Sequence, residues 1–182
     1  MRVKTKWHKE ERGKSLDEAA SVLGFIAWRA GMNALKEMDN EGFRFDSYDH
    51  QLQVMGEFMA FGLQVIDRLA HERLEDEDRR ELVQGLARHL VQHMAGNLQD
   101  IKGPGDHKGP FVELLNERGA EYAEFGFADG EPAHSFLRQF GMRVDGVMGG
   151  PGNKFCIEYV AEVAAPEVVK TLRKSLDDLL AD

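Results

Sequence analysis

Residues 47–101 decide the fold, and their sequence is SYDHQLQVMGEFMAFGLQVIDRLAHERLEDEDRRELVQGLARHLVQHMAGNLQDI. Apolar side chains recur in it every three or four residues, which is the period of an amphipathic helix. Two stripes result, Leu52, Met55, Met59, Gly62, Ile66, Leu69 and then Leu82, Leu86, Leu90, Met94, Leu98, Ile101. The acidic run 75–78 between them supplies the turn and a first helical turn, where carboxylates are favoured. The pattern predicts long helices over about 47–74 and 77–101, joined as an antiparallel hairpin.

An earlier helix is predicted from Ser15 to about Met38. Ser15 and Glu18 have the spacing of a capping box, in which each side chain satisfies a backbone donor at the open end of the helix. Between residues 19 and 32 nearly every face of this helix is apolar, so we expect it to be buried. Residues 1–14 carry six Lys and Arg and are expected to form a flexible basic leader.

Two glycines of this first helix mark a place of close packing. Gly24 and Gly31 lie seven residues apart and therefore on one helical face. We expect a neighbouring helix to approach closely there.

The second half of the chain is divided by glycine and proline into shorter segments. Helices are predicted near 109–126, 132–148, 153–164 and 166–180. The stretch 154–163 would also suit a strand, but no partner strand is evident, so a helix is favoured. The expected fold is an all-α helical bundle, with residues 15–182 forming a single domain.

Composition restricts the classes of function. The chain has 182 residues and a formal net charge of −9, which disfavours binding to nucleic acid. It contains no apolar run long enough to span a membrane. Cys156 is the only cysteine, so an intrachain disulfide and a cysteine-rich zinc site are excluded. These features favour the cytoplasm.

The best candidate metal ligands are His89 and His93, four residues apart and thus on one helical face. A zinc or iron site needs three or four ligands, so the alternative is two histidines at the core boundary with ordinary hydrogen bonds. A ferritin-like di-metal centre would need Glu-x-x-His motifs on core faces. The chain has one such motif, Glu131 to His134, at a helix start, and this class is excluded.

Charged residues near aromatic ones provide candidates for ligand binding. Arg29 interrupts the most apolar helix beside Trp28, so it either pairs with a carboxylate or binds an anion in a pocket. Glu57 of the second helix is a further candidate residue of that pocket. His134 and Arg138 share a helical face and could hold an acidic ligand or partner, or could pair with the protein's own carboxylates.

No motif in the chain indicates a particular reaction or cofactor, and no catalytic residue is identified. The surplus of Phe and Met favours either core filling or a dimer interface. The expected function is that of a non-enzymatic binding protein that acts as a homodimer. The alternative is a helical enzyme or sensor that holds a small anionic ligand or a metal ion between helices.

Overall fold

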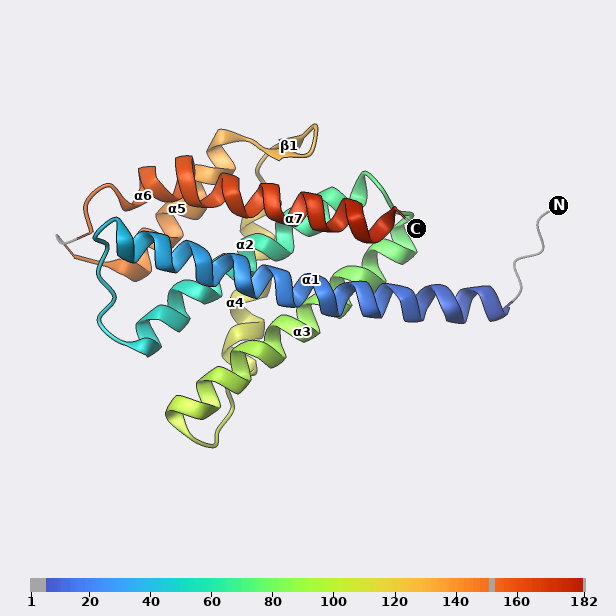
Figure 1. Cartoon of the computed structure of the whole chain (residues 1–182), viewed down its shortest axis with the longest axis horizontal. Coiled ribbons are helices and arrows are strands. Elements are labelled where there is room, and N and C mark those ends of the chain that lie inside the picture. The colour runs from blue at the N-terminus through green and yellow to red at the C-terminus, as the bar shows by residue number, and fades with distance from the viewer. Residues whose placement is uncertain (1–5, 151–152, 182) are drawn as a thin grey trace.

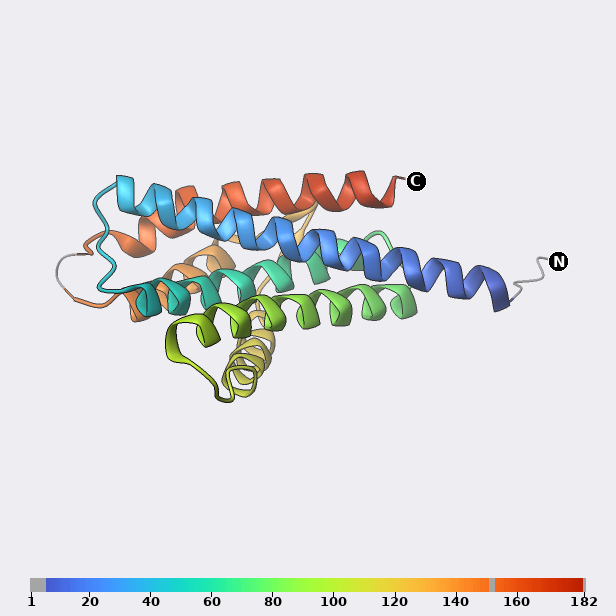
Figure 2. The ribbon, with the colours of Figure 1, turned by 60° about the horizontal axis from the view of Figure 1, so that its bottom comes forward.

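Helices α2 (Tyr48–His71) and α3 (Asp76–Lys102) form the predicted antiparallel hairpin. The hydroxyl of Ser47 accepts a hydrogen bond from the backbone N–H of His50 and so caps α2. Three acidic residues occupy the first turn of α3, as the sequence predicts. In this computed structural model the hairpin is part of an all-α bundle, with α3 along one side of it (Figures 1 and 2).

The structure describes the backbone of residues 6–150 and 153–181, and the side chains of residues 15–150 and 153–181. Within these ranges, no helix combines the length and the hydropathy needed to cross a lipid bilayer. The elements outside the hairpin are α1 (Lys6–Asn40), α4 (Gly109–Tyr122), β1 (Phe127–Ala128), β2 (Glu131–Pro132), α5 (His134–Met148), α6 (Cys156–Tyr159), the π-helix η1 (Val160–Ala164) and α7 (Ala165–Leu180).

Helix α2, rather than α1, is the central element, and this corrects the expectation that the first helix is the buried one. It packs against α1, α3, α4, α5 and α7, and its residues 54–63 are buried without interruption. Helix α2 also carries a row of polar side chains, which is typical of a surface helix, but several of them have partners from other parts of the protein. Arg79 donates two hydrogen bonds to Asp67, at 2.8 and 2.9 Å. Arg68 donates to three carbonyl groups, one on the last residue of α4 and two just beyond it.

Helix α1 lies across one side of the bundle (Figures 1 and 2). Its described side chains, from Ser15 onward, are buried on one face only. It begins at Lys6, so the predicted start at Ser15 is wrong, and the proposed leader 1–14 is helical from Lys6 onward. Lys, Glu and Arg are good helix formers, which explains why the helix continues through this segment. Residues 1–5 lie outside the described range.

The glycine contacts predicted for α1 are confirmed. A Cβ atom on Gly24 would lie 3.0 Å from the Cβ of His89 in α3, and one on Gly31 would lie 2.9 Å from Met59 in α2. A third such contact joins Gly85 of α3 to Ala20 of α1, at 2.9 Å. The small residues therefore allow α1 to pack closely on both helices of the hairpin.

Stacked aromatic rings fill the core between α2, α4 and α5. Phe61 stacks on Phe140 with 4.1 Å between ring centroids, and Phe58 meets Phe140 edge-on at 5.0 Å. Tyr122 of α4 packs against Phe136 at 4.9 Å. Much of the aromatic surplus noted in the sequence thus fills the core.

A short hairpin between α4 and α5 was not predicted. Asp129 and Gly130 both have positive φ, 54° and 75°, as the tight turn of a two-residue β-hairpin requires. Phe127 pairs with Pro132 and Ala128 with Glu131. Strands of two residues are too short to show a period-two pattern, so all of β1 and the first residue of β2 fall in the loop between the helices predicted to end at 126 and to start at 132.

The ambiguous stretch 154–163 is helical from Cys156 onward, after a turn at 154–155, which confirms the favoured alternative. It forms α6 and the start of η1, and η1 continues directly into α7. The N–H of Ala165 bonds to the carbonyl of Val160, five residues back. This wide turn lies just before Pro166, whose ring would clash with the carbonyl four residues earlier in a regular α-helix.

Candidate functional site

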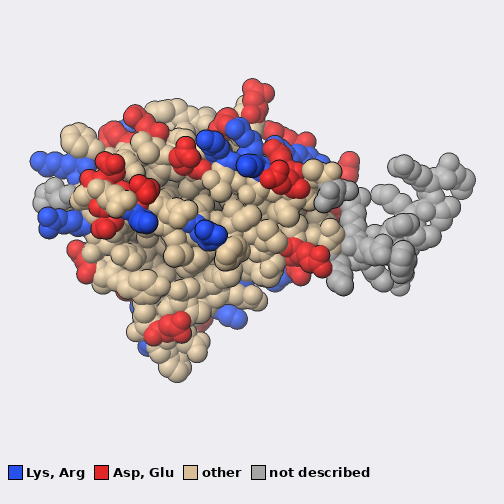
Figure 3. All heavy atoms as spheres, viewed as in Figure 1, with Lys and Arg blue, Asp and Glu red and all other residues tan. Residues whose placement is uncertain are grey.

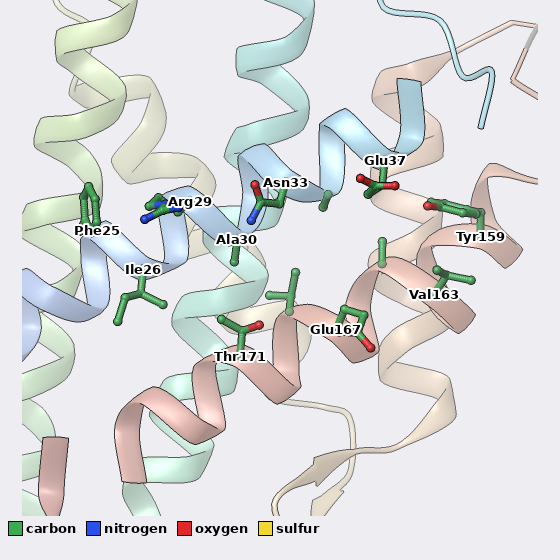
Figure 4. Close-up of a pocket in the computed structure, with 13 residues that line it drawn as sticks. Phe25, Ile26, Arg29, Ala30, Asn33, Glu37, Tyr159, Val163, Glu167 and Thr171 are labelled. Carbon is green, nitrogen blue, oxygen red and sulfur yellow. The ribbon is translucent and has the colours of Figure 1, made fainter. Parts of the chain in front are cut away.

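A groove runs between α1 and the η1–α7 segment, with a volume of about 410 Å³, and is called the α1–α7 groove below. Figure 4 shows Ile26 and Ala30 projecting from α1 toward α7, with Glu167 and Thr171 on the opposite wall. Its walls carry four small apolar residues, Ala30, Ala34, Ala164 and Val168. Short side chains at the line where two helices meet leave space that longer ones would fill.

Arg29 lies at one end of this groove and has an exposed guanidinium group. Its Cζ atom lies 5.7 Å from the centroid of the Phe25 ring, within the range of a cation–π contact. No carboxylate of the described residues lies within ion-pair distance of it. Glu37 and Glu167 line the groove farther along, so the groove has a cationic and an acidic part.

Trp28 lies on a different side of α1 from the α1–α7 groove. Its ring packs against His93 of α3, with 5.8 Å between centroids, and it lines a smaller groove of about 320 Å³ together with Met32 and Tyr48. The sequence placed an anion pocket at Arg29 beside Trp28, and the structure separates these two side chains.

Glu57 belongs to neither of these grooves. It is 3% exposed and accepts two hydrogen bonds from Arg118 of α4, at 2.7 and 2.8 Å. These hydrogen bonds raise the pKa of Arg118. Glu57 and Arg118 therefore form a buried ion pair between α2 and α4. This pair is not evident from the sequence.

The same ion pair continues into a network between α4 and α5. Arg118 also lies 3.8 Å from Glu121, which accepts hydrogen bonds from Arg143 and Gln139. Burial opposes ionisation of Glu121, but the bonds from Arg143 and Gln139 outweigh it, so its pKa is lowered. Beside the network, the fully buried hydroxyl of Tyr122 has no hydrogen-bond partner among the described residues, and burial raises its pKa.

His89 and His93 are on one face of α3, as predicted, and this face packs against α1. Burial, followed by the neighbouring charge of His89, lowers the pKa of His93. In the part of the chain that the structure describes, no cluster of three or more His, Cys, Asp or Glu side chains could hold a metal ion. Both histidines are half-buried where α3 meets α1.

His134 and Arg138 lie one turn apart on the exposed side of α5. Neither lines one of the grooves described here. Cys156 is 1% exposed, and burial raises the pKa of its thiol to about 12, so it behaves as a small apolar core residue.

The structure therefore does not bring the candidate residues into one site. Arg29 lines a groove, Trp28 and His93 contact each other, Glu57 is buried in an ion pair, and the α5 pair is exposed. Comparison with protein-family models, with curated proteins and with solved structures finds no significant match.

Proposed function

We propose that the protein is a non-enzymatic binding protein that acts as a homodimer, with the outward face of α1 as its interface. The observation that carries the proposal is the exposure of two large apolar side chains on that face. Phe25 is 55% exposed and Met32 is 54% exposed, seven residues apart on α1. Val22 precedes them on the helix and Val163 lies across the α1–α7 groove, both exposed. Apolar side chains grouped in this way favour burial against a partner.

The surface around these side chains has little charge. Figure 3 shows uncharged side chains over much of the middle of the face that α1 crosses. A stable interface covers about 800 Å² on each partner. A single phenylalanine contributes about 150–250 Å², so the face of α1 needs the rim of α7, including Val163, to reach this size.

The polar residues of the groove favour a second copy as the partner. Arg29 and Glu37 lie four residues before and four residues after Asn33, and all three line the groove. Two antiparallel copies of α1 that cross at Asn33 would place Arg29 of each copy opposite Glu37 of the other. An isologous interface needs this kind of self-complementarity.

Sedimentation velocity on single-residue variants tests the proposal. Phe25→Glu or Met32→Glu would place a carboxylate in the interface, and each is expected to convert the dimer to a monomer with unchanged helix content. Met142→Glu is the matched control because Met142 is 48% exposed and belongs to α5, not to the face of α1. A wild-type monomer at micromolar concentration, or equal loss of dimer in the control, would contradict the proposal.

A second candidate function uses the same groove for a small ligand with an anionic group. It is favoured by one observation, that the guanidinium of Arg29 has no carboxylate partner among the described residues. The ligand would place its anionic group at Arg29 and its apolar part over Ala30 and Ala34. Mass spectrometry of small molecules released from the purified protein tests it: a bound anion that disappears in Arg29→Met supports this function, and an empty wild-type protein contradicts it.

A further inference from the structure

A second groove lies between α3 and α4 on another part of the molecule, and is called the α3–α4 groove below. Both helices pack on α2 but make few direct contacts with each other. Figures 1 and 2 show them leaving their connecting loop in different directions. The space between them has a volume of about 700 Å³, and Leu63 and Gln64 of α2 line it together with the two helices.

The walls of this groove have the spacing of helical ridges. Val83, Ala87 and Val91 follow one another every four residues along α3, and Val112 and Leu115 lie on the facing side of α4. Rows of side chains at this interval are the ridges that pack into the grooves of another helix. Val112 is exposed, and the three residues of α3 are half-buried. The groove therefore presents an apolar surface suited to a helix lying between α3 and α4.

The charge of the groove is opposite to that of the whole protein. Of the 182 residues 32 are Asp or Glu, but none of the described residues that line the groove is acidic. Arg88 and Lys108 provide positive charge, and four carboxamides, Gln64, Gln84, Gln92 and Asn116, surround the apolar surface.

Two neighbouring carboxylates, Asp17 and Asp106, leave most of this positive charge available. Asp17 of α1 lies 3.7 Å from Arg88, and both side chains are well exposed, so this pair is loose. The carboxylate of Asp106 accepts hydrogen bonds from the backbone N–H groups of Lys108 and Gly109. No carboxylate among the described residues pairs with the ammonium group of Lys108.

We propose that the α3–α4 groove binds an acidic amphipathic helix of a partner protein. The apolar face of that helix would contact the valines and Ala87, and its flanking carboxylates would meet Lys108 and Arg88. The carboxamides can both donate and accept, so they suit the free backbone groups at a helix end. This site is separate from the proposed dimer interface and does not depend on it.

Selection from a peptide library tests the proposal. The library contains amphipathic peptides with leucine fixed at intervals of three and four residues and with the other positions randomised. Selection against the native protein is expected to enrich Asp and Glu at the positions that flank the leucines. Peptides without such enrichment, enrichment of Lys and Arg, or no peptide that survives selection would overturn the proposal.

The binding site of the selected peptide is then located with variants. Arg88→Glu combined with Lys108→Glu is expected to weaken binding by about tenfold or more, because both contacts become repulsive. Val112→Glu is expected to weaken it as well, whereas Ile101→Glu is the matched control. Ile101 lies outside the groove and is 39% exposed, compared with 41% for Val112.

Fluorescence anisotropy of the labelled peptide measures the affinity, and circular dichroism confirms that each variant keeps its helix content. Equal affinity for the wild-type protein and the Arg88→Glu/Lys108→Glu variant would overturn the proposal, as would equal weakening by Ile101→Glu. Phe25→Glu is expected to bind the peptide with unchanged affinity. The homodimer and the peptide site can therefore fail independently of each other.

Discussion

Replacing Arg118 with methionine is expected to destabilise the protein severely. The guanidinium of Arg118 makes two hydrogen bonds to Glu57, which is 3% exposed, and the Arg118 side chain itself is 13% exposed. Methionine removes the charge and both donors but keeps much of the apolar volume. Glu57 would then be a buried carboxylate without its partner.

Breaking a buried ion pair in this way costs about 3–5 kcal/mol of unfolding free energy. For a chain of this size, each kcal/mol corresponds to about 2–4 °C in Tm, so a fall of about 6–20 °C is expected. Urea unfolding followed by circular dichroism measures the free energy, and an unchanged m-value would show that the transition remains comparable.

Two further variants test the same reasoning. Arg88→Met is the matched control, since Arg88 and Asp17 are both about three-fifths exposed; a change within about 0.5 kcal/mol is expected. In the double variant Glu57→Leu/Arg118→Met no charge is stranded, and most of the lost stability should return. A loss of less than about 1 kcal/mol of unfolding free energy in Arg118→Met would refute the claim that Arg118 stabilises a buried charge on Glu57. The claim would also be refuted if the double variant were no more stable than Arg118→Met.

Gly141→Ala is expected to cost about 1–3 kcal/mol in urea unfolding, because a Cβ there would lie 2.7 Å from a backbone carbonyl oxygen of α6; Gly146→Ala in the same helix meets nothing within 4 Å and should be neutral or slightly stabilising. The pKa of Glu121 is below its ordinary value of 4.5, so its contribution is present above that pH and is lost as the pH falls below it. Glu121→Gln should therefore lower stability at neutral pH by about 1 kcal/mol and converge with the wild type in acid, and parallel pH profiles would contradict this. Arg29→Glu and Glu37→Arg should each weaken the dimer in sedimentation experiments, and their combination should restore it; failure of the restoration would exclude the antiparallel crossing at Asn33.

The long hairpin could be predicted from the sequence because its information is local. The two stripes of the helical period and the acidic first turn of α3 each act within one or two turns. The contacts at Gly24 and Gly31 could be predicted for the same reason, since the absence of a side chain is evident from the sequence alone.

The central position of α2 could not be predicted, because it depends on partners that are far away in the chain. From the sequence alone, the charge of Glu57 predicts an exposed position. It is buried because it pairs with Arg118, which lies 61 residues later in the chain. Asp67 and Arg68 are similar: one pairs with a residue of α3 and the other with carbonyl groups beyond α4. The period of apolar residues identifies a buried helical face only when the buried side chains are apolar, so it does not detect buried charged residues.

The candidate site was predicted in part. Arg29 was recognised as an unusual cation in an apolar helix, and it does line a groove. Trp28 is its neighbour in sequence, but successive residues of an α-helix differ by about 100° around the axis. The two side chains therefore lie on different sides of α1, and the groove partners of Arg29 come from α7, more than 120 residues later.

The mass of the wild-type protein in native mass spectrometry tests the central claim most directly. The proposal predicts a species of twice the chain mass at micromolar concentration, which Phe25→Glu converts to the mass of a single chain. A wild-type spectrum that contains only the single-chain mass under the same conditions would contradict the homodimer.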